Sequence, residues 1–244
     1  MPEEEPPASG PATSDLVRSR LELQRVATHL LARARFAASG RFGLRVTWDG
    51  IATPAFGADG DVLRIAGGLL VHESQRSGPA GSRAIAVDGH SLGELAGWAG
   101  VDLSAPFDAG PATPPVGDTG VPLAVGAGAC DALLSWYRVG ARAVDLLLAD
   151  LAEPSVLQLW PEHFDLGLDA ATAHGRVNLG TSPGDDAHPT PYLYVGPWEA
   201  DRPGDPGFWN ASFGAVLDAG DLDAAGDRTA GALRFFRRGL QLLG

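Results

Sequence analysis

The sequence predicts an α+β fold in which antiparallel β layers are braced by three long helices. Stretches with apolar side chains every three or four positions lie near each end and in the middle of the 244-residue chain. Between them come runs of short segments in which apolar and polar residues alternate. Runs of strands interrupted by single helices are typical of α+β proteins, because a doubly wound sheet alternates strand and helix regularly. We expect one domain over residues 15–244, or two lobes divided near 100–124.

The first helix is expected to begin at Ser14 or Asp15, either of which can cap its first turn, and to run to about Ser39. Gly40 is then expected to end it. Residues 1–14 are acidic at first and then rich in Pro, Ala, Ser and Gly, and they have no apolar period. We therefore predict a disordered tail there.

An antiparallel meander should follow, because the apolar period changes to two from Arg41 onwards. Asp49-Gly50 is a strong hairpin signal within it. The periods around Trp48, Trp98 and Trp136 predict that these three side chains lie in the core. The strands of the meander are predicted at 41–48, 51–56, 62–65, 69–72 and 84–87.

The second half begins after a short helix at 91–99 and a Pro- and Gly-rich crossing at 100–124. A second long helix is predicted at 130–152, and Glu153-Pro154 should stop it, since proline cannot continue a helix. The remaining elements are predicted as strands at 156–169, 175–180 and 192–196, a helical turn at 212–217 and a final amphipathic helix at 226–243.

Charge and cysteine content limit the possible partners. The formal net charge is −12, which argues against a nucleic-acid ligand, because phosphate binding needs clustered Arg and Lys. Cys130 is the only cysteine, which favours a reducing compartment. No apolar run approaches the length of a membrane span, and Glu3, Glu4 and Glu5 stand where a signal peptide would be basic. We expect a soluble cytoplasmic protein without nucleic-acid or membrane partners.

Residues 157–213 concentrate the groups that a binding site needs. This stretch holds three of the six tryptophans, all three histidines of the C-terminal half and many Pro, Gly and Asp residues. Aromatic side chains enclose a pocket, and polar groups orient the ligand. We therefore predict a binding site for a small molecule or a protein. Its expected ligand-binding residues are Trp160, His163, Asp165, Asp185, His188, Tyr192, Tyr194 and Trp198.

One alternative is a metal-dependent enzyme. On a strand, His163 and Asp165 point to the same side, which is the arrangement of the H-x-D motif in iron(II) oxygenases. His188 is the candidate third ligand and Asp185 the candidate base, with a divalent metal as the possible cofactor. In the competing interpretation Asp165 only orients a half-buried His163, and Asp185 belongs to a turn.

The position of His163 is itself a prediction. We expect its side chain to be at least half buried and to pair with a carboxylate or a backbone group. We also expect it to line the main cleft together with Trp160, Tyr194 or Trp198, because the strand at 192–195 is the nearest later strand able to pair beside it.

A second enzyme alternative rests on Gly89–Gly93, which matches the G-x-S-x-G nucleophile elbow with Ser91 as the nucleophile. With Glu94 added, the motif resembles the active-site motif of malonyl-CoA:acyl-carrier-protein transacylases. The chain lacks that family's arginine for the malonyl carboxylate and its N-terminal Gly-Gln-Gly motif. A serine acyl hydrolase or acyltransferase would use Ser91 with Asp165 and His188. The favoured interpretation is structural, since Ser91 and Glu94 have the spacing of a helix capping box.

Four motifs in the C-terminal half together resemble a group of actinobacterial proteins of unknown function. They are Leu-Trp-Pro-x-His-Phe-Asp at 159–165, Ser-Pro-Gly-Asp at 182–185, Pro-x-Pro-Tyr-Leu-Tyr-Val-x-Pro-Trp at 189–198 and Phe-Trp-Asn at 208–210. The resemblance is clearest over residues 155–215. It implies a shared pocket region and brings no established activity.

Overall fold

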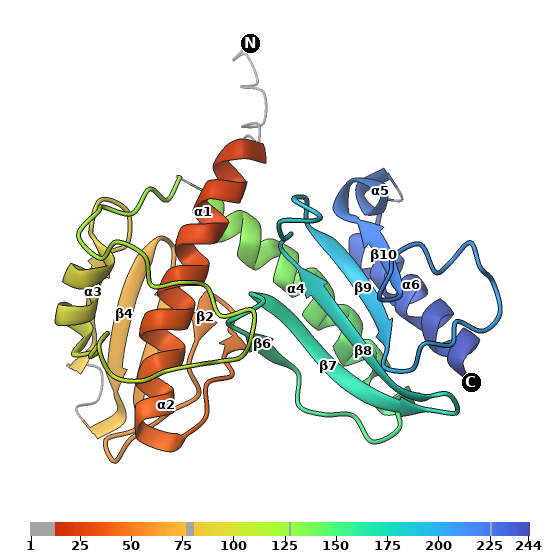
Figure 1. The fold of residues 1–244 in the computed structure, drawn as a ribbon, viewed down its shortest axis with the longest axis horizontal. Coiled ribbons are helices and arrows are strands. Elements are labelled where there is room, and N and C mark those ends of the chain that lie inside the picture. Colours follow the sequence, from red (N-terminus) through yellow and green to blue (C-terminus); the bar gives the residue numbers. More distant parts are fainter. Residues whose placement is uncertain (1–12, 77–80, 127, 225) are drawn as a thin grey trace, which may run out of the picture.

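The computed structural model confirms the α+β class, with two five-stranded antiparallel sheets and helices packed against them (Figure 1). It describes residues 13–76, 81–126, 128–224 and 226–244. The strands of each sheet follow one another in chain order. The first sheet comprises β1 (Arg45–Val46), β2 (Gly50–Ala52), β3 (Asp61–Ala66), β4 (Leu69–Ser74) and β5 (Arg83–Ala86). The second comprises β6 (Gln158–Trp160), β7 (Asp165–Thr172), β8 (Gly175–Ser182), β9 (Tyr192–Pro197) and β10 (Ala215–Asp218).

A long helical stretch precedes each sheet, so the chain builds a similar arrangement twice. The first stretch is continuous, but its middle turn has π geometry, and it divides into α1 (Thr13–Val26), η1 (Ala27–Ala32) and α2 (Arg33–Ser39). The second is α4 (Ala129–Leu147), which the short 3-10 segment η3 (Leu148–Asp150) extends. The prediction of three long helices therefore differs in detail, because a π turn divides the first of them. The other helices are α3 (Leu92–Ala99), α5 (Ala219–Ala224) and the long α6 (Arg228–Leu243).

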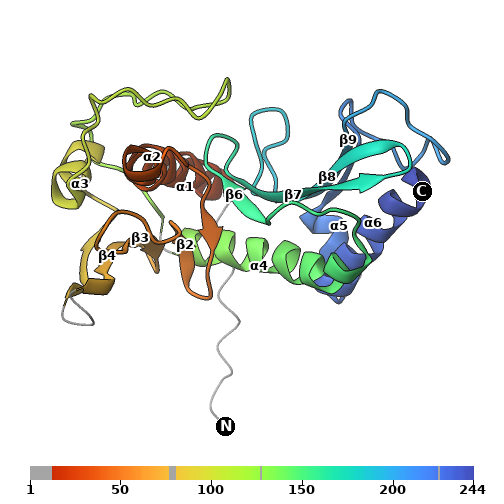
Figure 2. The same ribbon diagram turned by 90° about the horizontal axis from the view of Figure 1, so that it is seen from below.

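The two sheets meet edge to edge. Leu44, next to β1, forms a bridge with Leu159 of β6, in which each N–H donates to the other's carbonyl oxygen, at 2.8 and 2.9 Å. Helix α4 runs along this junction and contacts β1 and β2 as well as β7 and β8 (Figure 2). We call the first sheet with the helices packed on it the N-terminal lobe, and the second sheet with its helices the C-terminal lobe. Adjacent residues of α4 pack in different apolar cores, Tyr137 in that of the N-terminal lobe and Trp136 in that of the C-terminal lobe. This helix therefore ties the two cores together.

The crossing between the lobes has no apolar period, and polar side chains on one helix face hold it. Arg25, His29 and Arg33 are spaced four residues apart and so share a face of the first helical stretch. Arg25 donates to the carbonyl of Val116, and the Nε2 atom of His29 lies at hydrogen-bond distance from that of Pro114, each at 2.8 Å. Arg33 donates to a third carbonyl of the crossing. These bonds satisfy backbone groups that would otherwise lack partners.

The C-terminal sheet packs one face on helices and leaves the other open. Along β8 the side chains of Val177 and Leu179 are fully buried in the apolar core that includes α4 and α6. Asn178 lies between them and is exposed on the opposite face, since side chains alternate along a strand. Figure 2 shows α4, α5 and α6 all on the same side of this sheet. The opposite face is therefore available for a site.

Three local predictions are wrong. The strand predicted at 156–169 is interrupted by a turn over Pro161–Phe164, in which Phe164 adopts the left-handed conformation with φ 55°. The helical turn predicted at 212–217 is in part strand β10, because the edge of β9 offers backbone groups that β10 can pair with. Trp48 is 85% exposed, since β1 already ends at Val46 and Trp48 lies in the following turn, with Arg138 4.7 Å from its ring centroid.

The beginning of the first helical stretch differs from its prediction, and its end agrees with it. The tail predicted at 1–14 lies outside the described residues up to position 12, and Thr13 and Ser14 already belong to α1. Gly40 ends the stretch as predicted, with φ 68°. None of the described helices is long and apolar enough to cross a membrane.

Candidate ligand-binding groove

A groove lies on the open face of the C-terminal sheet, within the region where the sequence predicts a binding site. It has two hollows, of about 470 and 410 Å³. The hollows share five lining residues and therefore form one groove, which we call the sheet-face groove. The shared residues are His163, Asp165, Asn178, Tyr194 and Trp198. The first hollow is completed by Ser182, Asp185, Tyr192, Gly196, Pro197 and Phe213, and the second by Ser155, Trp160, Glu162, Gly167, Leu168 and Asp169.

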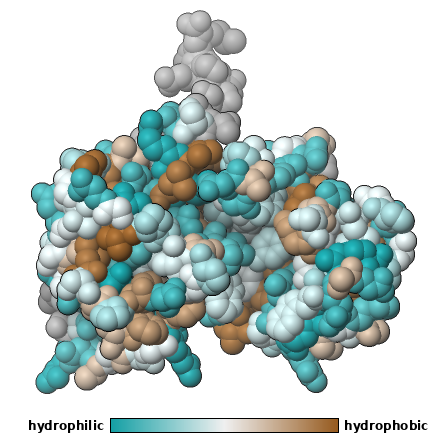
Figure 3. Space-filling model, in the orientation of Figure 1, coloured by the Kyte–Doolittle hydropathy of each residue, from teal (hydrophilic) through white to brown (hydrophobic). Residues whose placement is uncertain are grey.

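The surface of this face is polar and aromatic rather than aliphatic. In Figure 3, which has the orientation of Figure 1, pale and teal residues predominate over the C-terminal lobe. Trp198 and Phe213 are large apolar side chains of the groove that face solvent, exposed by 60% and 46%. The indole N–H of Trp198 donates to the side-chain oxygen of Asn178 at 2.8 Å. Phe213 comes from the loop before β10 and packs edge-on to Tyr194, with ring centroids 6.5 Å apart. Both rings therefore have defined positions.

Tyr194 lies across the floor of the groove and donates a hydrogen bond to Asp165, two strands away on β7. This reach requires glycine on the strands that the side chain crosses. A Cβ atom on Gly180 would lie 2.3 Å from the Tyr194 hydroxyl oxygen, and one on Gly167 would lie 2.6 Å from it. Carbon atoms cannot approach so closely, so only glycine fits beneath the ring. The single contact between Tyr194 and Asp165 thus requires glycine at positions 167 and 180.

Asp165 is a carboxyl group with an incomplete set of partners. Burial raises its pKa above the ordinary value of 3.8, although the hydrogen bond from Tyr194 and the nearby His163 act in the opposite direction. Its Oδ1 atom is buried and has no hydrogen-bond partner among the described residues. Burial also raises the pKa of Glu162, whose Oε2 atom is buried and has no hydrogen-bond partner within the described part of the chain. The groove therefore holds two carboxyl groups that bind protons more tightly than exposed ones.

These raised pKa values predict that folding stability falls as the pH rises. The folded state binds protons at Asp165 and Glu162 more tightly than the unfolded state, so deprotonation above the ordinary pKa of Asp, 3.8, costs stability until the folded-state pKa is passed. Asp165→Asn removes one of these groups and keeps an acceptor for Tyr194. We expect this variant to become progressively more stable relative to wild type as the pH rises above about 4, the ordinary pKa of Asp, measured by urea unfolding. Asp145→Asn, on an exposed position of α4, is the control. Parallel pH profiles for Asp165→Asn and wild type would contradict the expectation.

Asp185 is the second carboxylate of the first hollow, and it is well supplied with donors. Its Oδ2 atom accepts from the Tyr192 hydroxyl at 2.6 Å, and its Oδ1 atom accepts from the backbone N–H groups of Ala187 and His188 at 2.8 and 2.7 Å. Burial alone would raise the pKa of Asp185, but these hydrogen bonds outweigh burial and lower it. Asp185 is therefore ionised at neutral pH. It is both a turn residue and a groove residue.

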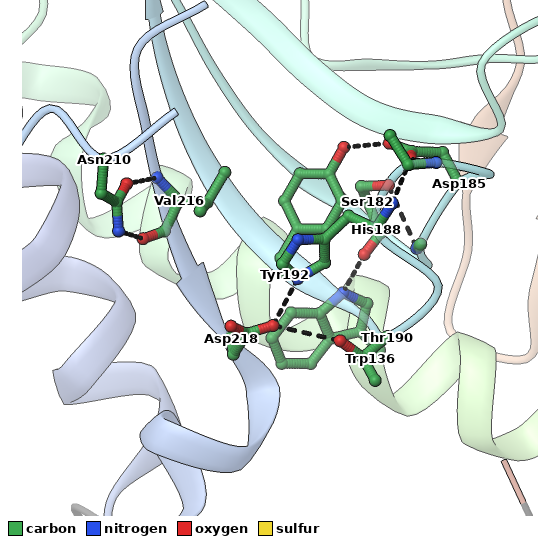
Figure 4. Close-up of polar contacts among 11 residues, drawn as sticks. Trp136, Ser182, Asp185, His188, Thr190, Tyr192, Asn210, Val216 and Asp218 are labelled. Atoms are coloured by element: carbon green, nitrogen blue, oxygen red, sulfur yellow. Dashed lines mark hydrogen bonds and ion pairs between the residues drawn. The ribbon is translucent and has the colours of Figure 1, made fainter. Parts of the chain in front are cut away.

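His188 lies beside the groove rather than in it. Its Nε2 atom is 2.5 Å from Asp218, which also accepts a hydrogen bond from Thr190 at 3.1 Å. Its ring packs edge-on against Tyr192, with centroids 4.7 Å apart (Figure 4). On its other side, Tyr192 reaches Asp185. His188 therefore helps to position Tyr192 for its contact with Asp185.

His163 lines both hollows, but not in the way predicted. It lies in the turn over Pro161–Phe164, and its side chain is exposed, whereas burial was expected. It does line the first hollow together with Tyr194 and Trp198, as predicted. The described residues also give its ring no hydrogen-bond partner. Asp165 begins β7 only after this turn, and the two-residue alternation of a strand therefore does not relate the two side chains.

The metal alternative lacks its ligand set. Within the described ranges of the chain, no group of three or more His, Cys, Asp or Glu side chains is arranged to hold a metal ion. His163 and Asp165 both line the groove, whereas His188, the expected third ligand, pairs with Asp218 instead.

Ser91 caps α3, as the favoured interpretation predicts. Its hydroxyl oxygen accepts from the backbone N–H of Glu94 at 3.2 Å, and the Glu94 carboxylate accepts from the backbone N–H of Ser91 at 2.8 Å. The Ser91 hydroxyl donates to the same carboxylate at 2.9 Å, so it pairs with an acid rather than a histidine. The other members of the expected triad, Asp165 and His188, belong to the C-terminal lobe, whereas α3 belongs to the N-terminal one (Figure 1).

Asn178, Ser182 and Phe213 are groove residues that the sequence did not predict. The signal for Asn178 and Ser182 was the alternation of β8, which places residues 176, 178, 180 and 182 on one face. No local pattern predicts Phe213. Its loop is fixed by Asn210, whose side-chain amide accepts from and donates to the backbone of Val216 at 2.8 and 3.0 Å (Figure 4).

No protein-family model matches the chain, and comparisons with curated proteins and with solved structures also find no match. The resemblance to actinobacterial proteins of unknown function therefore stays a prediction. A function for the chain has to be inferred from the geometry of the groove.

Proposed function

We propose that this protein binds a small molecule in the sheet-face groove. The contact between Tyr194 and Asp165 carries the proposal, because two strand glycines are needed to let an aromatic side chain meet a desolvated carboxyl group on the groove floor. A buried carboxyl oxygen without a partner costs stability. Such groups are concentrated at functional sites, where the cost is compensated by ligand binding or catalysis.

The size and lining of the groove support a small ligand. Pockets for small molecules commonly enclose about 300–1,000 Å³, and the first hollow encloses about 470 Å³. Aromatic rings lie beside a small number of polar groups, which is the usual composition of such sites. The net charge of −12 favours a ligand other than a nucleic acid, and the single cysteine favours a reducing, cytoplasmic setting.

Filling the groove with a side chain tests this proposal. Gly196 lines the first hollow, and a Cβ atom there would meet no atom closer than 3.8 Å. Gly196→Leu should therefore fold, while its side chain occupies space that a ligand needs. We expect fragment-sized compounds that bind wild type in ligand-observed NMR to lose about tenfold or more of their affinity for this variant.

Gly97→Leu is the matched control, because a Cβ atom on this exposed position of α3 meets no atom within 4 Å. It adds the same side chain in the other lobe, and we expect it to bind the fragments as wild type does. The circular dichroism spectrum and Tm of both variants should match wild type. Unchanged fragment binding by a folded Gly196→Leu variant would overturn the proposal.

A further inference from the structure

Acidic side chains predominate along the groove, although the buried Arg20 lies close enough to Asp185 to help lower the pKa of that carboxyl. The described residues that line it include four carboxylic acids, Asp165 and Asp185 in the first hollow and Glu162 and Asp169 in the second, and no Arg or Lys. Asp169 is balanced by an ion pair with Arg176. Asp185 is ionised and lies in the same hollow as Asp165. Arg20 offsets part of the Asp185 charge but does not line the hollow, so carboxyl oxygens and no guanidinium group are presented to a ligand by its described lining. The net charge of the chain, −12, adds to the attraction of cations.

Hydrogen-bond donors of the groove are largely used within the protein. The hydroxyl of Tyr194 donates to Asp165, and that of Tyr192 donates to Asp185. The indole N–H of Trp198 donates to the side chain of Asn178. What the groove offers a ligand is therefore mainly oxygen acceptors and aromatic rings. This combination suits a ligand that brings its own donors.

We propose that the ligand of the sheet-face groove is an organic cation, an ammonium or guanidinium group carried on a small apolar body. This inference rests on the proposed function of the groove and specifies its ligand class. The cationic group lies near Asp165 and Asp185, and the apolar body lies against Trp198 and Phe213. Carboxylates accept hydrogen bonds from ammonium and guanidinium groups. The Trp198 ring supplies apolar surface for the body of the ligand, and Arg176 of the chain itself already lies 5.8 Å from the centroid of this ring.

Other ligand classes fit the same groups less well. An anion would be repelled by Asp185 and would find no Arg or Lys among the described lining residues. A neutral polyol makes its contacts through both donors and acceptors, but the tyrosine hydroxyls already donate to carboxylates.

Three probes with one apolar body separate these classes. Phenethylammonium, phenylethanol and phenylacetate carry a positive, a neutral and a negative group, and their dissociation constants for wild type can be compared by NMR titration at neutral pH. We expect phenethylammonium to bind about tenfold more tightly than phenylethanol, and phenylacetate to bind most weakly.

Asp185→Asn tests whether the carboxylate causes the preference. We expect this variant to lose about fivefold to tenfold of its affinity for phenethylammonium and to keep its affinity for phenylethanol, which shows that the groove is intact. Asp145→Asn, outside the groove, should change neither. Phenylethanol or phenylacetate binding as tightly as phenethylammonium would overturn the cation proposal but leave the groove as the site. Both proposals fail if none of these probes and no neutral fragment binds wild type, or if Gly196→Leu leaves all of their binding unchanged.

Discussion

Phe164→Ala is expected to destabilise the protein by about 3–5 kcal/mol, the usual cost of removing a fully buried phenylalanine. Phe164 has no exposed surface and packs edge-on against Tyr137 of α4, with ring centroids 5.9 Å apart. Its carbonyl also accepts a hydrogen bond from the Tyr137 hydroxyl at 2.5 Å. Alanine and phenylalanine are similarly strained at φ 55°, so the variant reports the loss of the side chain. Urea unfolding measures the change in free energy.

Phe164 also determines where its two neighbours, both of them groove residues, are placed. Its turn carries His163 into the groove and starts β7 at Asp165, so the core contact of one residue places its two neighbours. Phe213→Ala is the matched control, because Phe213 is 46% exposed, and we expect it to cost less than about 1 kcal/mol. Similar costs for the two variants would show that Phe164 is not a core residue.

Gly180→Ala has the second largest expected effect, a loss of about 2–3 kcal/mol. The new Cβ atom would lie 2.3 Å from the hydroxyl oxygen of Tyr194, so the ring must leave the groove floor, and its hydrogen bond to Asp165 is lost. Overpacking of this kind costs about 1–3 kcal/mol, and the orphaned carboxyl adds to it. Gly196→Ala, on the same face, is the control, since its Cβ atom has ordinary contacts at 3.8 Å.

A double-mutant cycle identifies the cause of this loss. In a Tyr194→Ala background the ring is absent, and we expect Gly180→Ala to cost less than about 0.5 kcal/mol. The resulting coupling between positions 180 and 194 is then about 2 kcal/mol. If Gly180→Ala costs as much in the Tyr194→Ala background as in wild type, the glycine is required for the backbone and not for the tyrosine.

Elements with a clear local period could be predicted from the sequence. The first helical stretch, the meander over β2 to β5 and the final helix follow from apolar spacing. Capping residues predict the end of the first stretch at Gly40 and the beginning of α3 at Ser91. The turn at Pro161–Phe164 could not be predicted in this way, because it depends on the left-handed conformation of Phe164. Contacts in the core with Tyr137, a residue distant in sequence, stabilise that conformation.

The candidate site was predictable in composition but not in arrangement. Six of the eight expected residues line the first hollow. Strand alternation accounts for Asp165, Tyr192 and Tyr194, whereas His163 and Asp185 reach the hollow from turns. Trp160 lines the second hollow. The sequence could not show that His188 turns to Asp218, since that pairing depends on β10, where the local pattern suggested a helical turn. The need for Gly180 beneath Tyr194 likewise depends on a contact across strands.

The central claim is that the sheet-face groove is the ligand site of this protein, and the most direct test is the position of bound fragments in crystals soaked with a fragment library. We expect electron density for fragments beside Trp198, Tyr194 and Asp185, in the first hollow. Fragments that gather instead in the hollow of the N-terminal lobe lined by Arg33 and His72, with the sheet-face groove empty, would contradict it.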